Sequence, residues 1–181
     1  MAGFLFNRSL RVKDLLAHLP RLRRYARALT GDRLAADDLV QDTIERALSR
    51  SMLFRRESRL DAWLLTIMHN IFVSQMRQAA AQPSLASLED IPHYPASAAT
   101  QEDRLALRDL ERALARLPLE QREVILLVGL EEFSYEEAAK ILGIPVGTLM
   151  SRLSRARERL RSLLSGDPPP DARAITLKIV K

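Results

Sequence analysis

The 181-residue sequence contains no cysteine and only six glycines, and aromatic residues make up 5% of it. Without cysteine the protein has no disulfides and no thiolate chemistry, and a reducing compartment suits it. No apolar run approaches the ~18 residues that a membrane-spanning helix needs. The first residues also lack the long apolar segment and the small-residue cleavage site of a secretory signal. We therefore expect a cytoplasmic protein with no direct membrane insertion.

Residues that carry catalysis or bind metals are also sparse. The three histidines, His18, His69 and His93, are scattered through the chain and show no metal-ligand spacing. Neither a glycine-rich phosphate loop nor a nucleophile motif is present. We therefore expect no catalytic residues, no metal and no cofactor, and we regard an enzyme with a DNA-binding tail as a weak alternative.

Leucine, alanine, arginine and glutamate dominate the composition, which favours helix over sheet. Hydrophobic residues make up 47% of the chain, enough to bury a core. The formal net charge of +5 gives a mild bias toward anionic partners. These features predict an all-α protein, and the sequence pattern indicates how its helices are grouped.

The first part of the chain, residues 1–81, has helical periodicity from about residue 10 to residue 80. We expect one helix from Pro20 to the stop signal Gly31, and a broadly apolar, most buried helix over residues 60–78, with Trp63 in the core. Between them, one stripe of the 34–49 segment is predicted to face the core: Leu39, Val40, Thr43, Ile44, Ala47 and Leu48.

Residues 82–101 contain Pro83, Pro92 and Pro95 and show no apolar period, so we interpret them as a flexible linker. Helical periodicity resumes over residues 102–166, where four helices are expected. Residues 167–181 form a proline-led tail to which we assign no role. The sequence therefore predicts two small helical domains joined by a linker.

The last two predicted helices form a helix-turn-helix pattern. Ser134 and Glu137 form a capping box, so a helix should begin at Tyr135. It should end at Leu142, because Gly143 supplies a tight turn before the next helix. A short helix, a glycine-containing turn and a longer basic helix are typical of DNA-binding modules.

The second of these helices has two distinct sides. Spacings of four and three residues predict a core-facing stripe of Leu149, Leu153, Ala156, Leu160 and Leu163. The opposite side carries Ser151, Ser154, Arg155, Glu158 and Arg161, flanked by Met150, Arg152, Arg157 and Arg159. Short hydroxyl residues let a helix approach base edges closely, and arginine can contact guanine bidentately. A solvated basic face is the alternative.

Segments from both domains, in order, resemble one family. "LTGDRLAADDLVQDTIERAL", then "FRRESRLDAWLLTIMHN", then "SYEEAAKILGIPVGTLMSRLSRAR" are similar to the small bacterial sigma factors of the extracytoplasmic-function type. The resemblance covers about residues 12–164. It implies that residues 1–81 are region 2, which binds the RNA polymerase core and the promoter −10 element. Residues 102–166 would be region 4, which binds the −35 element, and an anti-sigma factor would control the protein.

The resemblance also implies roles for residues in region 2. Asp38, Gln41 and Asp42 match the motif that docks on the β′ clamp helices, and their i, i+3, i+4 spacing puts them on one face. Without the family, an ordinary solvated face would be the interpretation. The residues that match the −10 element site are Phe54, Arg55, Arg56, Ser58, Asn70 and Arg77. Arg56 stands where the family usually has glycine.

In region 4, the resemblance assigns −35 recognition to the basic helix. It also implies that the protein makes a second contact with the polymerase core, at the β flap. The matching residues are Thr148, Met150, Ser151, Arg152, Ser154, Arg155 and Arg157. Arginine is common where Met150 stands, so the −35 preference should differ here. Arg152 and Arg157 are expected to contact phosphates. The rival interpretation is a conventional helix-turn-helix regulator that acts without polymerase, although no dimerisation coiled coil is evident.

Overall fold

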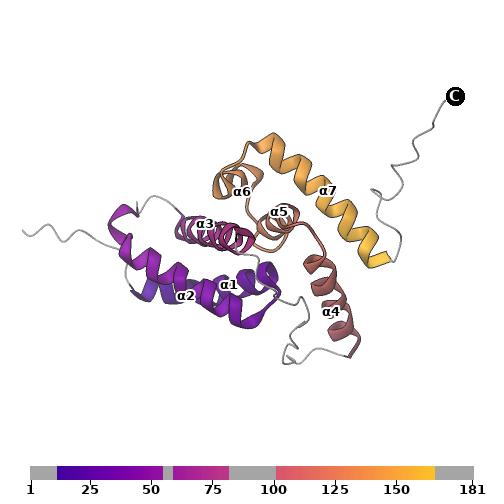
Figure 1. The fold of residues 1–181 in the computed structure, drawn as a ribbon, viewed down its shortest axis with the longest axis horizontal. Coiled ribbons are helices and arrows are strands. Elements are labelled where there is room, and N and C mark those ends of the chain that lie inside the picture. Colours follow the sequence, from indigo (N-terminus) through magenta and orange to yellow (C-terminus); the bar gives the residue numbers. More distant parts are fainter. Residues whose placement is uncertain (1–11, 55–58, 82–100, 166–181) are drawn as a thin grey trace, which may run out of the picture. The chain divides into compact units, whose positions relative to one another are not determined.

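The computed structural model describes residues 12–54, 59–81 and 101–165. The chain divides into two compact units, Met1–Ile91 and Pro92–Lys181, and each is described separately. Within the described ranges all regular structure is helical (Figure 1). The two-unit, all-helical architecture predicted from the sequence is therefore confirmed. The predicted linker lies almost entirely outside the described residues, as does the predicted C-terminal tail.

The N-terminal unit consists of α1 (Val12–Thr30), α2 (Arg33–Ser49), a 3₁₀ turn (Ser51–Leu53) and α3 (Leu60–Ala81). Gly31 ends α1 as predicted, because its φ of 72° is a left-handed conformation that glycine adopts without strain. Asp32 then caps α2 by accepting a hydrogen bond from the backbone N–H of Ala35 at 2.7 Å. The predicted start of α1 was wrong, since the helix begins at Val12 and passes through Pro20.

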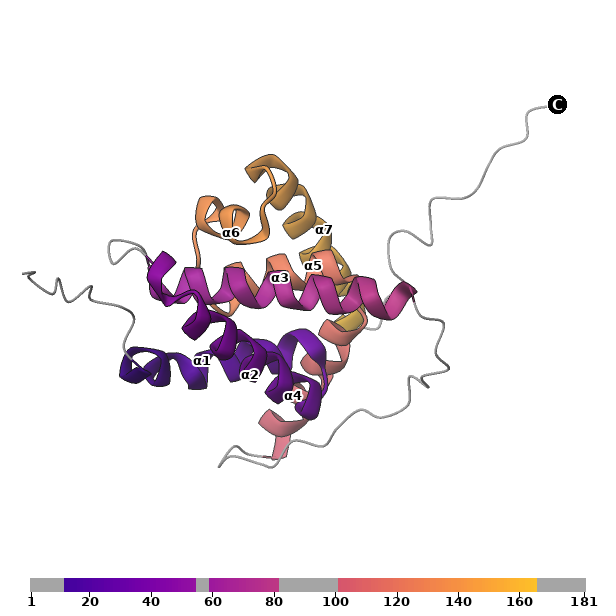
Figure 2. The same cartoon turned by 60° about the vertical axis from the view of Figure 1, so that its left-hand side comes forward.

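The core of this unit lies between α3 and the α1–α2 pair, and Figure 2 shows α3 running along one side of that pair. Its fully buried large side chains include Leu15, Leu22, Tyr25, Leu29, Leu39, Leu64, Leu65 and Met68. The buried hydroxyl of Thr43 donates to the Leu39 carbonyl at 2.7 Å, so it is not left without a partner. On α3, burial is confined to the first part of the helix, and the residues beyond Val73 are exposed.

Of the predicted core positions of this unit, Leu48 was wrong, and Ile44 and Trp63 are half-buried. Leu48 is 42% exposed, because at 100° per residue it falls on the side of Gln41 and Glu45 rather than with Thr43 and Ala47. Trp63 is only half-buried, since the first turns of α3 fill the core with Leu64 and Leu65 instead. The Trp63 ring packs against Phe54 at a centroid distance of 5.1 Å and an interplanar angle of 48°.

The C-terminal unit consists of α4 (Gln101–Ala115), α5 (Leu119–Gly129), α6 (Tyr135–Leu142) and α7 (Val146–Ser165). Its core includes Val124, Leu127, Ala138, Leu149, Leu153 and Ala156. Arg122 joins α5 to the end of α4 by donating to the carbonyls of Leu114, Ala115 and Leu117. Burial lowers the pKa of Arg122, and its guanidinium satisfies carbonyls that the end of a helix leaves unpaired.

The helix-turn-helix predicted from the sequence is present in α6 and α7. Ser134 Oγ accepts from the Glu137 N–H at 3.2 Å, and the Glu137 carboxylate accepts from the Ser134 N–H at 3.0 Å. Gly143 ends α6 with a φ of 63°, and the N–H of Ile144 donates to the Ala139 carbonyl at 3.0 Å. On α7, Leu149, Leu153 and Ala156 are buried as predicted, whereas Leu160 and Leu163 are half-buried.

Candidate functional site

The exposed face of α2 carries the polar stripe of Asp38, Gln41 and Asp42, which the structure places side by side on the surface of the N-terminal unit. Gln41 Nε2 donates to the Glu45 carboxylate at 3.0 Å. Gln75, on α3, donates its Nε2 to Asp42 Oδ2 at 3.0 Å. The donor on Gln75 is neutral, so it orients the Asp42 carboxylate without cancelling its charge.

Apolar side chains lie at both ends of this stripe. Leu34 is 76% exposed, and Leu48 is 42% exposed on the same side of α2. Met52 and Leu53, in the 3₁₀ turn that follows α2, are exposed as well. Acidic and amide groups flanked by exposed apolar side chains form a surface suited to a basic protein partner that also offers apolar contacts.

The sequence-predicted −10 residues lie in part on α3. Asn70 is exposed and donates its Nδ2 to the Thr66 carbonyl at 2.8 Å, so its own side-chain carbonyl is presented outward from a fixed orientation. Arg77 is exposed seven residues further on, which puts it on the same side of the helix. Phe54 contacts Trp63 at the base of this surface. Arg55, Arg56 and Ser58 lie outside the described residues.

A buried carboxylate, that of Asp61, holds the start of α3 together with two arginines, and the sequence did not predict this cluster. Asp61 accepts from Arg59 Nε at 3.2 Å, from Arg59 Nη2 at 2.7 Å and from the N–H of Ala62 at 2.8 Å. It also pairs with Arg21 of α1. Burial raises the pKa of Asp61, but these hydrogen bonds and the two arginine charges outweigh it and lower the pKa to about 2. In the sequence, Asp61 stands at the start of the apolar segment of α3, two residues after Arg59, and this was the available signal for an ion pair.

The outer face of α7 presents short hydroxyl side chains beside an arginine. Ser151 and Ser154 are exposed, and Ser151 Oγ donates to the Thr148 carbonyl at 2.9 Å. Arg155 donates its Nε to the Ser151 carbonyl at 3.3 Å and its Nη2 to Ser151 Oγ at 3.4 Å. These contacts direct the guanidinium back toward the N-terminal half of α7, where the side chains around it are short.

Arginines on the two flanks of α7 differ in how they are engaged. Arg152 pairs with Glu120 of α5 at 2.8 Å, and its side chain is only 23% exposed. Arg157 is exposed on the other flank. Of these two sequence-predicted phosphate contacts, Arg152 is thus already engaged within the unit, whereas Arg157 lies at the surface.

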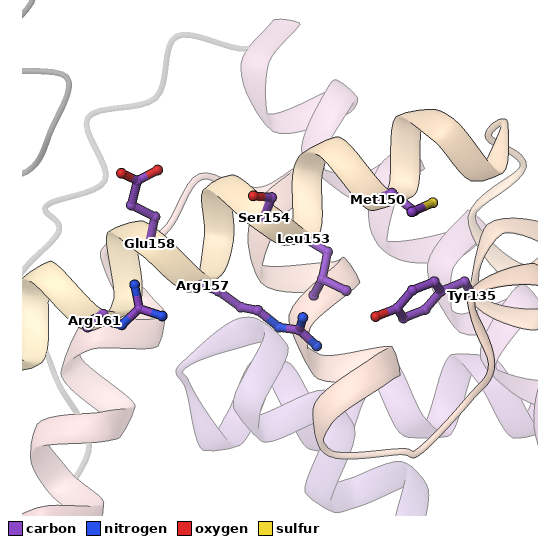
Figure 3. Close-up of a pocket in the computed structure, with 7 residues that line it drawn as sticks. All are labelled: Tyr135, Met150, Leu153, Ser154, Arg157, Glu158 and Arg161. Atoms are coloured by element: carbon purple, nitrogen blue, oxygen red, sulfur yellow. The ribbon is translucent and has the colours of Figure 1, made fainter.

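A hollow of about 390 Å³ lies beside α7, and we call it the α6–α7 hollow. It is lined by Tyr135, Met150, Leu153, Ser154, Arg157, Glu158 and Arg161. Figure 3 shows the Tyr135 hydroxyl and the Arg157 guanidinium pointing into the same space below Leu153, with Met150 at that end. From the sequence, Tyr135 is predicted only as the first residue of a helix. A tyrosine at the first position of α6 combines an aromatic ring with a hydroxyl, and this combination was the available signal for a residue that lines a surface hollow.

Comparison with known proteins shows the family to which this chain belongs. Residues 15–69 match the family described as the Sigma2 domain of PhyR, and residues 107–160 match Sigma-70, region 4. The chain is 41% identical over 161 residues to the ECF RNA polymerase sigma factor EcfG of Rhodopseudomonas palustris, covering 87% of each chain. It is a member of the ECF sigma factor family.

Other relatives agree with this membership. The sigma factor is 37% identical over 147 residues to SigM of Mycobacterium tuberculosis, covering 81% of this chain and 73% of that protein. Its structure is similar to that of the sigma factor RpoE of Bartonella quintana, solved in complex with the anti-sigma factor NepR. That similarity has a TM-score of 0.76 at 41% identity, with 86% of this chain and 97% of the other covered.

As an ECF sigma factor the protein binds RNA polymerase and directs promoter-specific initiation of transcription. The rival interpretation, a helix-turn-helix regulator that acts without polymerase, is not favoured. Members of this family are transcription initiation factors rather than enzymes. Among the described residues, no helix is long and apolar enough to cross a membrane.

Proposed function

We propose that the two units divide promoter recognition between them. The N-terminal unit docks on the polymerase core through Asp38, Gln41 and Asp42 and holds the −10 element along α3. The C-terminal unit reads the −35 element as duplex with α7. The observation that carries this proposal is the outer face of α7, where Ser151 and Ser154 leave base edges accessible to the oriented guanidinium of Arg155.

The core-docking surface is the polar stripe of α2 with its apolar ends. The β′ clamp helices, a basic coiled coil, are the partner that the family assigns to this motif. Asp42 is oriented by Gln75, which reduces the conformational freedom that docking has to remove. The acids set orientation and encounter rate, and exposed Leu34 and Leu48 supply apolar contact area.

The −10 surface consists of the exposed side of α3 and the segment before it. A base that leaves the duplex needs a polar group for its edge and a surface on which to pack. Asn70 offers an oriented carbonyl, and the Phe54–Trp63 pair offers an aromatic surface. Arg77 is placed to contact a phosphate. We extend the proposal to Arg55, Arg56 and Ser58 on the strength of the sequence resemblance.

On the −35 surface, Ser151, Ser154, Arg155 and Met150 face the bases. Thr148, Arg152 and Arg157 contact the backbone, with Arg152 exchanging Glu120 for a phosphate. The same unit contacts the β flap of the core. Residues 82–101 join the two units, and such a tether makes the second DNA contact effectively intramolecular, so two weak modules specify a promoter jointly.

The same relatives support a proposal about the regulation and the place of action of this protein. The related Bartonella sigma factor was solved with an anti-sigma factor, and we propose that a protein of that kind holds this chain inactive. The protein acts in the cytoplasm, where promoter DNA and polymerase are found. It supplies no catalytic group of its own and needs no cofactor.

Charge reversal at the docking stripe tests the proposal. Asp42→Arg should weaken assembly with bacterial core polymerase at least tenfold, because it places a cation against a basic partner. Asp14→Arg, the same change on α1, should assemble as the unaltered protein does. Gln75→Ala should cause a smaller loss than Asp42→Arg, because it removes only the orienting hydrogen bond. Normal holoenzyme assembly by Asp42→Arg would return the stripe to an ordinary solvated face.

A further inference from the structure

Met150 is an apolar side chain left at the surface of the first half of α7. It is 52% exposed, whereas its neighbours Leu149 and Leu153 are buried. The residues one and four positions on are Ser151 and Ser154, so no long side chain of that face covers the thioether. A flexible, polarizable side chain in this position adds little to the fold and remains available to a partner.

The surroundings of Met150 favour nucleic acid as that partner. It lies at one end of the α6–α7 hollow, where the Tyr135 hydroxyl and the Arg157 guanidinium point into the same space (Figure 3). Arg161 also lines the hollow. Two guanidiniums and a phenol hydroxyl, against the single carboxylate of Glu158, suit the phosphates of a DNA strand, while Met150 and Leu153 add apolar lining beside them.

Base edges in the major groove offer one clearly apolar group, the 5-methyl of thymine. Guanine, adenine and cytosine present acceptors or amino donors that a thioether does not satisfy. An arginine at this position would favour guanine, whereas methionine forms no hydrogen bond of comparable strength. The exposed thioether of Met150 therefore suits an apolar group on a base edge better than a polar one.

We infer that Met150 is a specificity-determining residue that contacts the 5-methyl group of a thymine in the −35 element. The inference rests on the proposed function, because it requires α7 to lie in the groove of that element. It adds the identity of one base to that function. A thymine at the contacted position is preferred over cytosine, whose edge lacks the methyl group.

Removing single methyl groups from the DNA tests this directly. The 181-residue protein is assembled with bacterial core polymerase, and a −35 element is selected from a promoter library randomised over that element. Each thymine, on both strands, is then replaced by deoxyuridine, which lacks only the 5-methyl group. One thymine should show about a fourfold loss of promoter affinity, as expected when one buried methyl group is lost.

The same promoters with protein variants identify the reader of that methyl group. In Met150→Ala, the thymine and deoxyuridine promoters should bind equally at the sensitive position, because the two changes remove the same contact. Met76→Ala, which removes a methionine on α3 that is 42% exposed, should retain the fourfold difference. Met150→Leu should retain most of it, since leucine is also apolar.

Three results would overturn the inference while leaving the proposed function intact. They are a selected element without thymine on either strand, a wild-type holoenzyme insensitive to every deoxyuridine, and a sensitivity that persists in Met150→Ala. A different measurement shows whether the proposed function itself fails. If scrambling the whole −35 element leaves promoter affinity unchanged, α7 does not read it, and the inference falls with it.

Discussion

The guanidinium of Arg21, on α1, pairs with the carboxylate of Asp61 at the start of α3, joining positions that are 40 residues apart in the sequence. Arg59 binds the same carboxylate from the other side. The buried acid therefore fixes the first turn of α3, just after the segment that the family uses for the −10 element. Because its carboxylate is buried and paired with two arginines, we expect it to position that helix rather than to contact DNA.

Asp61→Asn should lower the free energy of unfolding of the N-terminal unit by about 1–3 kcal/mol at pH 7, because two arginines lose their anion. The pKa of Asp61 is lowered to about 2 from an ordinary value of 3.8. Its contribution is therefore complete above about pH 4 and is lost as the pH falls to about 2. Denaturant titrations should therefore show that the difference in the free energy of unfolding between Asp61→Asn and the unaltered protein narrows as the pH falls through that range. Asp38→Asn, on the exposed face of α2, is the control.

The turn of the helix-turn-helix offers a matched pair of glycines. Gly143→Ala should destabilise α6 and α7 by about 1–2 kcal/mol, because its φ of 63° strains any side chain that carries a Cβ. Gly147→Ala should stabilise them by about 0.5–1 kcal/mol, since Gly147 is helical and an added Cβ meets nothing within 4 Å. Hydrogen exchange of the α6 and α7 amides checks both. Equal effects of the two substitutions would contradict the left-handed turn.

The Arg152–Glu120 pair leads to a prediction about DNA affinity. Glu120→Gln should raise holoenzyme affinity for promoter DNA about twofold to fivefold, the usual range for one exposed ion pair, because it releases Arg152 for a phosphate. The gain should shrink as salt is added. It should also be absent in the Glu120→Gln, Arg152→Ala double variant. A gain that survives removal of Arg152 would show that it comes from the loss of the Glu120 charge and not from a released Arg152.

Arg155 should carry base recognition at the −35 element. Arg155→Ala should cost about 1–3 kcal/mol of discrimination between the selected −35 element and a scrambled one, the usual worth of a bidentate arginine contact. Arg155→Lys keeps the charge but loses the planar fork, so it should lose discrimination while binding all DNA with nearly unchanged salt dependence. Affinity titrations on both DNAs separate the two effects. Full discrimination by the lysine variant would reduce Arg155 to a phosphate contact.

Local signals in the sequence were sufficient for much of the fold. The Ser134–Glu137 capping box, Gly143 and Gly31 each fix a helix end through their own backbone chemistry, and the structure bears out all three. The start of α1 was harder, because Pro20 suggested a helix start and instead lies within α1. The position of Leu48 was misjudged because a stripe drawn from apolar residues alone ignored its angle around the helix.

The candidate site was only partly accessible from the sequence. The face of α7 that carries Ser151 and Arg155 follows directly from helical periodicity. The Arg152–Glu120 pair and the Gln75–Asp42 hydrogen bond each join two helices, and single-helix periodicity carries no information about such pairs. Tyr135 and Asp61 each had a local signal in the sequence, but the contact of Asp61 with Arg21 and the hollow beside Tyr135 depend on how neighbouring helices pack.

Transcription with purified bacterial core polymerase tests whether this protein directs promoter-specific initiation by docking through the α2 stripe. A promoter library is transcribed over many rounds with and without this protein, and with the Asp42→Arg variant in parallel. We expect new transcripts whose promoters share a −35 and a −10 element at fixed spacing, and we expect the Asp42→Arg variant to lose them. An unchanged set of transcripts, with no detectable binding of the protein to core polymerase, would contradict this role.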